Sequence, residues 1–235
     1  MKDKEIVMLY GYTNLIIDGA LMTMNLAVMS ALLSMILGLI GACAKIFGSK
    51  LSSTVASLYS TIIRGIPDLV LMLLIFYGLQ IALNQITESF SWQQININPF
   101  VTGVLTIGFI YGAYLTETFR GAFLAVVKGQ IEAATAYGFT PWQVFRFVLF
   151  PQMMRHALPG LENNWLVILK STALVSIIGL ADVVKATQMA GKGTYEFFFF
   201  TIIAALIYLL FTTFSNIVFY WLDKQFQFDR KDARL

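Results

Sequence analysis

Charged residues are scarce in this chain: they make up only 12% of its 235 residues, whereas hydrophobic residues make up 58%. Soluble domains carry about 25% charged and about 45–50% apolar residues. A chain this poor in charge cannot coat a globular surface with polar groups. The composition therefore excludes a soluble enzyme, a nucleic-acid-binding protein and a disordered segment. The net charge of +3 is too small to indicate a polyanionic partner.

Cysteine and histidine occur once each, as Cys43 and His156. A single cysteine cannot form an intrachain disulfide, and one cysteine with one histidine does not predict a metal site. The sequence also has no H-E-x-x-H pattern and no G-x-x-x-x-G-K-[ST] phosphate-binding loop. We therefore expect no enzyme activity and no bound cofactor in this chain, so any ATP chemistry has to come from another chain.

Long apolar runs are what the sequence has instead, and five of them can cross a hydrocarbon core of about 30 Å. We predict an all-α integral membrane protein with a single transmembrane domain over residues 1–235. No cleavable signal peptide is expected, because the first apolar run is too long for one. The predicted spans are 19–44, 69–83 with an upstream extension over 57–66, 100–126, 158–180 and 197–221.

Lysine and arginine are divided unequally between the two sides of these spans, with nine on one side and four on the other. Cytoplasmic segments carry the excess of positive residues. We therefore predict a multi-pass protein of a bacterial inner membrane, with its N-terminus outside and its C-terminus in the cytoplasm. The nine cytoplasmic residues lie in segments 45–57 and 127–157 and in the C-terminal tail.

The cytoplasmic segment 128–157 predicts two helices that meet at a sharp corner. Gly138 suits the left-handed position just after a helix. Thr140, Pro141 and Gln143 fit the N-cap, first position and third position of a capping box. On helix signals alone, this segment is either a docking element or an ordinary helix at the membrane surface.

Within this segment, Glu132, Ala133 and Ala134 are followed at fixed spacing by Gly138 and by V-L-F-P at 148–151. This pattern resembles the E-A-A-x3-G-x9-I-x-L-P signature of ABC-importer permeases. In that family the segment is the coupling helix, which sits in a groove on the cytoplasmic ATPase. The resemblance implies that these four residues dock the ATPase, and that the fold is that of a type I importer.

Other motifs extend the resemblance to the polar amino-acid branch of the family. They are R-G-I-P-D-L at 64–69, Y-x-x-E-x-x-R-G at 114–121, H-A-L-P at 156–159 and L-K-S-T-A-L at 169–174. The chain is most similar to permeases for basic amino acids (histidine, lysine, arginine and ornithine). The resemblance implies three partners besides the lipid bilayer: a second permease of similar fold, a dimer of ATPase subunits that uses ATP and Mg, and a periplasmic or lipid-anchored amino-acid-binding protein.

Charged residues inside the spans are costly and usually paired or turned inward. Arg64 and Asp68 flank Pro67, which predicts a break near residues 63–67. The pair forms either a hinge or gate, or a structural ion pair at a helix start. Glu117 and Arg120 share a helical face, which favours a structural ion pair near the cytoplasmic end of the third span.

The fourth span carries Glu162, Asn163, Asn164 and Lys170, a set too polar to face lipid. We expect these residues to line a substrate path, with Glu162 meeting a cation and Lys170 meeting a carboxylate; alternatively, Lys170 pairs with a neighbouring span or subunit. A rival function is a stand-alone secondary transporter that uses Glu117, Glu162 and Lys170 as a proton relay. We see no internal repeat, although such transporters often have one.

Overall fold

The computed structural model describes residues 9–91, 93 and 97–227, and this part of the chain consists of helices and their connections, without a strand. The all-α prediction is therefore confirmed over these residues. In chain order the elements are α2 (Thr13–Phe47), α3 (Lys50–Gly65), α4 (Asp68–Ser89), α5 (Pro99–Ala125), α6 (Lys128–Ala136), α7 (Pro141–Gln143), the π-helix η1 (Val144–Leu149), α8 (Phe150–Ser171), the 3-10 helix η2 (Thr172–Ile178), α9 (Val183–Thr194) and α10 (Phe197–Gln227).

Four of these helices, α2, α4, α5 and α10, are long and apolar enough to cross a membrane. A fifth candidate is broken: the helical stretch Pro141–Ile178 is followed by α9 at an angle of 52°. The four to five candidates agree with the five predicted spans. The fourth span does not continue as one α-helix to residue 180, because η2 tightens its end and Gly179, at φ 100°, stops it.

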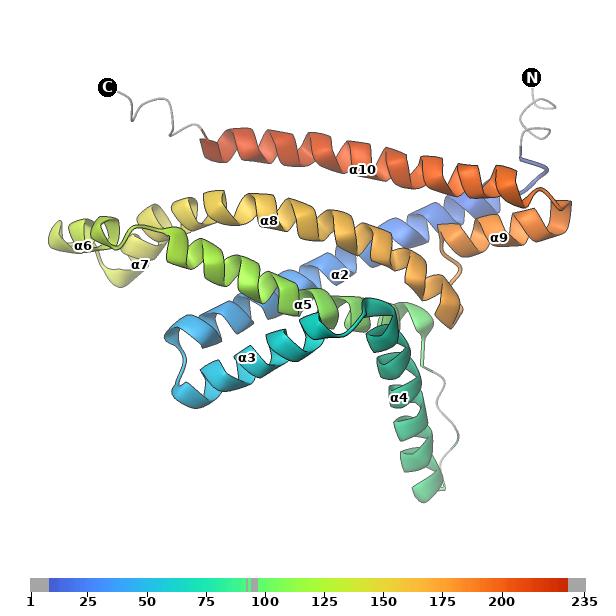
Figure 1. The fold of residues 1–235 in the computed structure, drawn as a ribbon, viewed down its shortest axis with the longest axis horizontal. Coiled ribbons are helices and arrows are strands. Elements are labelled where there is room, and N and C mark those ends of the chain that lie inside the picture. Colours follow the sequence, from blue (N-terminus) through green and yellow to red (C-terminus); the bar gives the residue numbers. More distant parts are fainter. Residues whose placement is uncertain (1–8, 92, 94–96, 228–235) are drawn as a thin grey trace.

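The second predicted span is shorter than expected at its start. Its proposed extension over residues 57–66 is wrong, because these residues belong mainly to α3, which packs against α2 and α5. The predicted break is present. Ile66 is extended because it precedes Pro67, and Pro67 then serves as the N-cap of α4. In Figure 1, α3 folds back beside α2, whereas α4 points away from the other long helices.

α5 is the most buried of the candidate spans and lies against α2 along much of its length. Two glycines on α5 permit this close approach. A Cβ atom at Gly108 would lie 2.5 Å from Leu33 Cδ2, and one at Gly112 would lie 2.9 Å from Leu37 Cβ. Small residues four apart commonly bring membrane helices together in this way.

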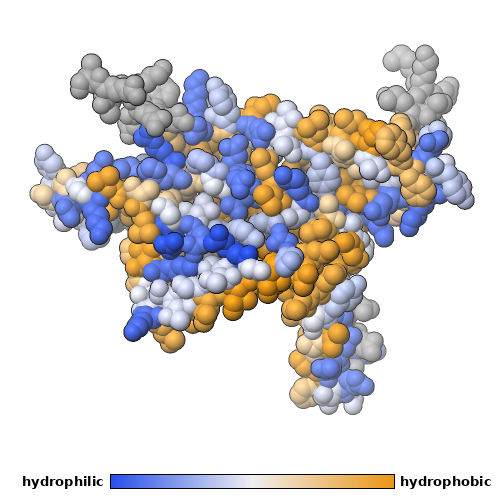
Figure 2. All heavy atoms as spheres, viewed as in Figure 1, coloured by the Kyte–Doolittle hydropathy of each residue, from blue (hydrophilic) through white to orange (hydrophobic). Residues whose placement is uncertain are grey.

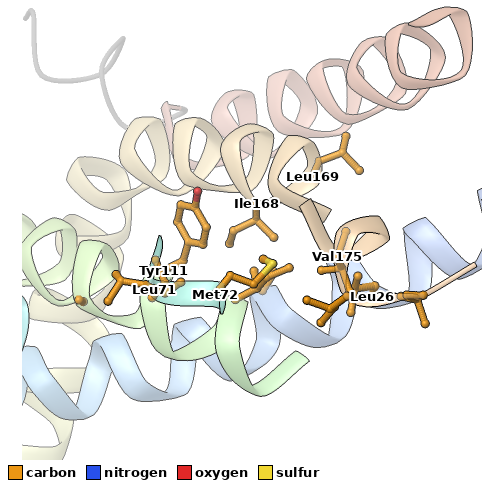
Figure 3. Packing of buried hydrophobic residues seen from close by; sticks show 14 of the residues in the cluster. Leu26, Leu71, Met72, Tyr111, Ile168, Leu169 and Val175 are labelled. Atoms are coloured by element: carbon orange, nitrogen blue, oxygen red, sulfur yellow. The ribbon is translucent and has the colours of Figure 1, made fainter. Parts of the chain in front are cut away.

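The largest core cluster joins α2, α3, α4, α5, α8 and η2 in the middle of the molecule. Figure 3 shows Leu71 and Met72 beside Tyr111, whose hydroxyl points toward α8. Figure 2 shows hydrophilic residues at the two ends of the molecule, over α6 and α9, and also across the middle of this face, with hydrophobic residues gathered around that central group.

Candidate functional site

The first group of candidate residues forms an exposed corner at one end of the molecule (Figure 1). α6 ends at Ala136, and Gly138 then takes φ 83°, a conformation that costs most residues energy but not glycine. The Thr140 hydroxyl accepts a bond from the Gln143 N–H, and the Gln143 side chain accepts one from the Thr140 N–H at 2.8 Å. The predicted corner and its capping box are confirmed.

The outer surface of this corner is open to a partner. Glu132 and Ala133 are exposed, whereas Ala134 is buried against the rest of the chain. Tyr137 and Trp142 are 87% and 69% exposed, so both rings lie on this outer surface. Sequence reasoning missed these aromatics because they occupy positions that the recognised motif leaves unspecified. It also missed the π-helix η1, which follows the corner directly.

The second group is a charge cluster where α2, α3 and α5 meet. The predicted pair is present, with Arg120 Nε 2.9 Å from Glu117 Oε2. The other carboxylate oxygen of Glu117 pairs with Lys45, which also donates to the Ser60 hydroxyl at 2.6 Å. The Lys45 side chain is only 9% exposed. From the sequence, Lys45 was expected in a cytoplasmic loop. Its pairing with Glu117 was not predicted, because the two residues are 72 positions apart and no local spacing relates them.

The third group surrounds the break between α3 and α4. Among the described residues, Arg64 and Asp68 form no ion pair with each other, so the structural-pair alternative is wrong. Asp68 Oδ2 instead accepts a bond of 2.6 Å from the Tyr111 hydroxyl, which also lies 2.6 Å from the Ser171 Oγ. The Arg64 guanidinium lies 5.4 Å from the centre of the Tyr114 ring, a cation–π distance.

These contacts leave a half-buried carboxylate in the middle of the bundle without a cationic partner among the described residues. Tyr111 is 2% exposed and stacks on Tyr114 with ring centroids 5.5 Å apart. An aromatic face and a carboxylate together attract cations. The sequence pointed to Asp68, but only the fold brings it the Tyr111 hydroxyl, which also meets Ser171.

The fourth group, on α8, does not form one cluster. Asn164 is buried, and its amide donates to the Gly160 carbonyl at 2.7 Å and to the Thr118 hydroxyl at 3.3 Å. Asn163 is exposed and Glu162 is half-buried. In the part of the chain that the structure describes, no hydrogen bond or ion pair joins any two of the four predicted residues.

Lys170 lies on the wall of a separate cavity of about 380 Å³ between the end of α8, α9 and α10. Thr187, Gln188, Thr201 and Tyr208 add hydroxyl and amide groups to this wall. A lysine among such groups can hold a carboxylate. No group of three or more metal-ligating side chains occurs among the described residues.

Comparisons with known proteins show which family this sequence and fold resemble. The family described as "binding-protein-dependent transport system inner membrane component" matches residues 34–227. The histidine/lysine/arginine/ornithine transport system permease protein HisQ of Escherichia coli is 60% identical, over 97% of this chain and 100% of HisQ. The arginine ABC transporter permease protein ArtQ of Haemophilus influenzae is 36% identical, over 93% of this chain and 97% of ArtQ.

Two solved structures of ABC transporters contain chains with a similar fold. A chain in the crystal structure of an amino acid ABC transporter with histidines is 33% identical, with a TM-score of 0.79, and the match covers 94% of this chain and 98% of that one. A chain of the inward-facing MetNI methionine ABC transporter is 17% identical, with a TM-score of 0.68 over 96% of this chain and 99% of that one, and shows the same fold.

Proposed function

Because the chain belongs to the family of binding-protein-dependent transport system inner membrane components, we propose that it is the permease of an ATP-driven importer for basic amino acids in a bacterial inner membrane. The names of its relatives support this substrate class, since they carry histidine, lysine, arginine and ornithine or arginine alone. The structural observation that carries the proposal is the exposed, rigidly capped corner formed by α6 and α7.

We propose that this corner receives the closing motion of a cytoplasmic ATPase dimer. Glu132, Ala133 and Ala134 lie on α6, and Gly138 fixes the angle at which the chain turns back. ATP and Mg would act on the partner subunits, while this chain transmits movement to α5 and α8. The orientation follows from the same proposal, with the corner and the C-terminus in the cytoplasm and the N-terminus outside. Segment 128–157 is then the coupling segment of a single permease domain.

The substrate path would pass the middle of the bundle. Asp68 is the candidate counter-charge for a basic side chain, because its carboxylate lies beside Tyr111 and Tyr114 without a cation of its own. Lys170 is the candidate contact for the substrate carboxylate, in its cavity near α9. Arg64 and Pro67 would form the gate at the break where α4 begins.

The remaining α8 residues have weaker roles in this path. Asn164 has its amide engaged by Gly160 and Thr118, so it would hold α8 against α5 rather than contact substrate. Glu162 and Asn163 keep accessible polar groups and stay candidates for the path. Glu117 and Arg120 would be structural, because both are engaged in the cluster with Lys45.

The partners follow from the family. We propose a second permease of similar fold, an ATPase dimer, and a periplasmic or lipid-anchored amino-acid-binding protein. α4 is the candidate surface for the second permease, since only 11% of its most apolar window is buried in this chain and it points away from the other long helices (Figure 1).

The experiment is a pull-down of the tagged chain from its native membrane, followed by mass spectrometry of the recovered proteins. The complex is then assayed for ATPase activity with arginine, lysine and histidine. We expect a P-loop ATPase and a second permease to be recovered with the wild type. Both the ATPase and the stimulated activity should be lost in Glu132→Lys/Gly138→Val. Gln130→Ala, an exposed change on the same helix, is the matched control and should retain both.

The same preparation tests the rival function. A secondary transporter would come out alone and carry substrate into proteoliposomes without ATP. The described contacts disfavour such a relay, because Glu117 is held by Lys45 and Arg120, and no hydrogen bond or ion pair links it to Glu162 or Lys170. ATP-independent uptake would nevertheless overturn the importer proposal.

A further inference from the structure

A deep groove runs between α2, α5, α8 and α10 and encloses about 370 Å³. It is separate from the Lys170 cavity and from the polar cluster around Asp68. Among the described residues that line it, Asn164 and the indole N–H of Trp165 supply the polar groups. The apolar wall residues are Val28, Ala31, Leu32, Met35, Leu115, Met154, Leu158, Leu161, Trp165, Ile168, Phe219, Leu222 and Phe226.

The wall offers few groups to a polar ligand, although the buried indole N–H of Trp165 has no hydrogen-bond partner among the described residues. Asn164 already uses its amide nitrogen on Gly160 and Thr118. At the same time, Val28, Leu32 and Met35 remain 39%, 47% and 37% exposed within this chain. Apolar surface of this extent is covered in a membrane protein by lipid or by another helix. The occupant is therefore mainly apolar.

The size of the groove favours a lipid chain over a helix. A helix is about 10 Å wide, and one that crosses a single leaflet is about 15 Å long, so it fills roughly 1,200 Å³. Counting its open side, the space between the groove walls is about 920 Å³, which is still less than such a helix fills. Four helices surround it, so a fifth could enter only if α10 moved away from the bundle. An acyl chain has no such requirement.

The length and the ends of the groove suit the same occupant. On α8 the wall runs from Met154 to Ile168, about 21 Å at 1.5 Å per residue, which exceeds the roughly 15 Å depth of one leaflet. The Met154 end faces the part of the molecule that holds α6, α7 and the end of α10 (Figure 1). Arg155, Lys224 and Asp223 lie along the chain at this end and together carry a net positive charge, which attracts a lipid phosphate.

We propose that this groove binds one acyl chain of a phospholipid, whose headgroup lies at the end of the molecule that holds α6 and α7. The acyl chain fills the space between α10 and the rest of the bundle. It touches α8 directly beside the Asn164 contact that joins α8 to α5. This site is formed only by the membrane-spanning helices. Lipid binding there is therefore independent of the substrate and of the coupling role proposed above.

The test is photolabelling of the full chain, together with whatever subunits copurify, in nanodiscs. The nanodiscs contain phosphatidylethanolamine and phosphatidylglycerol, with a trace of phosphatidylglycerol that carries a diazirine in its acyl chain. Labelled peptides are mapped by mass spectrometry. We expect saturable labelling of Leu161 and Trp165 in the groove, well above the labelling of Leu210, which is 69% exposed on the outer side of α10.

The controls are matched substitutions on α2. Leu32→Trp fills the groove from its half-exposed wall, and it should reduce labelling of Trp165 at least fivefold while leaving Leu210 unchanged. Ile36→Trp, one turn further along and 58% exposed outside the groove, should change neither. If Leu32→Trp prevents recovery of the protein, Leu222→Trp fills the groove from α10 and the same comparison applies.

Two results would overturn the proposal. One is non-saturable labelling of Trp165 at the level of Leu210 that the filling variants do not change, which would mean ordinary contact with bulk lipid. The other comes from a photoreactive benzoylphenylalanine at Leu161. A crosslink to a peptide of another subunit in place of lipid would mean that a protein helix occupies the groove.

Discussion

The charge cluster that joins α2, α3 and α5 supports a quantitative prediction. Glu117→Gln removes the carboxylate that neutralises Lys45, whose side chain is 9% exposed. Breaking a buried pair by removing one partner costs about 3–5 kcal/mol, because the other charge stays buried and unpaired. Glu117 is itself 21% exposed and retains a polar amide after the change, so we expect the lower end of this range, about 3 kcal/mol.

A double-mutant cycle separates the pair from other effects of the substitution. Lys45→Met alone leaves Glu117 with Arg120, which is 39% exposed, so we expect a loss of about 1–2 kcal/mol. The double variant Lys45→Met/Glu117→Gln contains no unpaired buried charge. Its loss should therefore be smaller than the sum of the two single losses by about 1–3 kcal/mol.

The assay is the free energy of unfolding of the purified chain from denaturant titrations in mixed micelles, with helix content as the signal. Arg120→Gln is the control and should cost less than about 1 kcal/mol, because Arg120 is the exposed member of the cluster. Additive losses in the double variant would refute the reasoning. Such a result would mean that Lys45 reaches water when Glu117 is changed.

Four further predictions concern the corner, the path and the packing. Gly138→Val should abolish substrate-stimulated ATPase activity, whereas Gly138→Asn should retain most of it, because asparagine tolerates a positive φ; steady-state ATPase assays of the assembled complex check this. Asp68→Asn should reduce arginine uptake into proteoliposomes at least tenfold, about 1.4 kcal/mol, without loss of assembly; unchanged uptake would exclude the counter-charge role. Lys170→Met should raise the KM for arginine more than it lowers kcat in the same uptake assay. Gly112→Val should destabilise the chain by about 1–3 kcal/mol through overpacking against α2, whereas Gly121→Ala, where the added methyl group meets open space, should be neutral in the same denaturant titration.

Whether the sequence predicted a contact in the candidate sites depended on how far apart the two residues lie along the chain. The Glu117–Arg120 pair and the Gly138 corner depend on residues three to five positions apart, so the sequence alone predicted both. Lys45 was missed because its partner lies 72 residues away on another helix. Of the two alternatives for Arg64 and Asp68, the structural ion pair was wrong for a related reason. Local spacing allows it, but Tyr111 and Tyr114 of α5 offer both side chains other partners.

The sequence by itself determined the all-helical class, the membrane environment, the break before Pro67 and the capped corner. Apolar run length, proline geometry and capping act within a turn or two of helix, so they can be read from neighbouring residues. Only the tertiary structure decided that α3 folds back as a separate helix, and that the Tyr111 hydroxyl lies within hydrogen-bond distance of both Asp68 and Ser171. It also decided that Asn164 is engaged while Lys170 opens into a different cavity. These arrangements depend on which helices pack together and at what rotation, because a helix turns about 100° per residue and neighbouring side chains therefore face different partners.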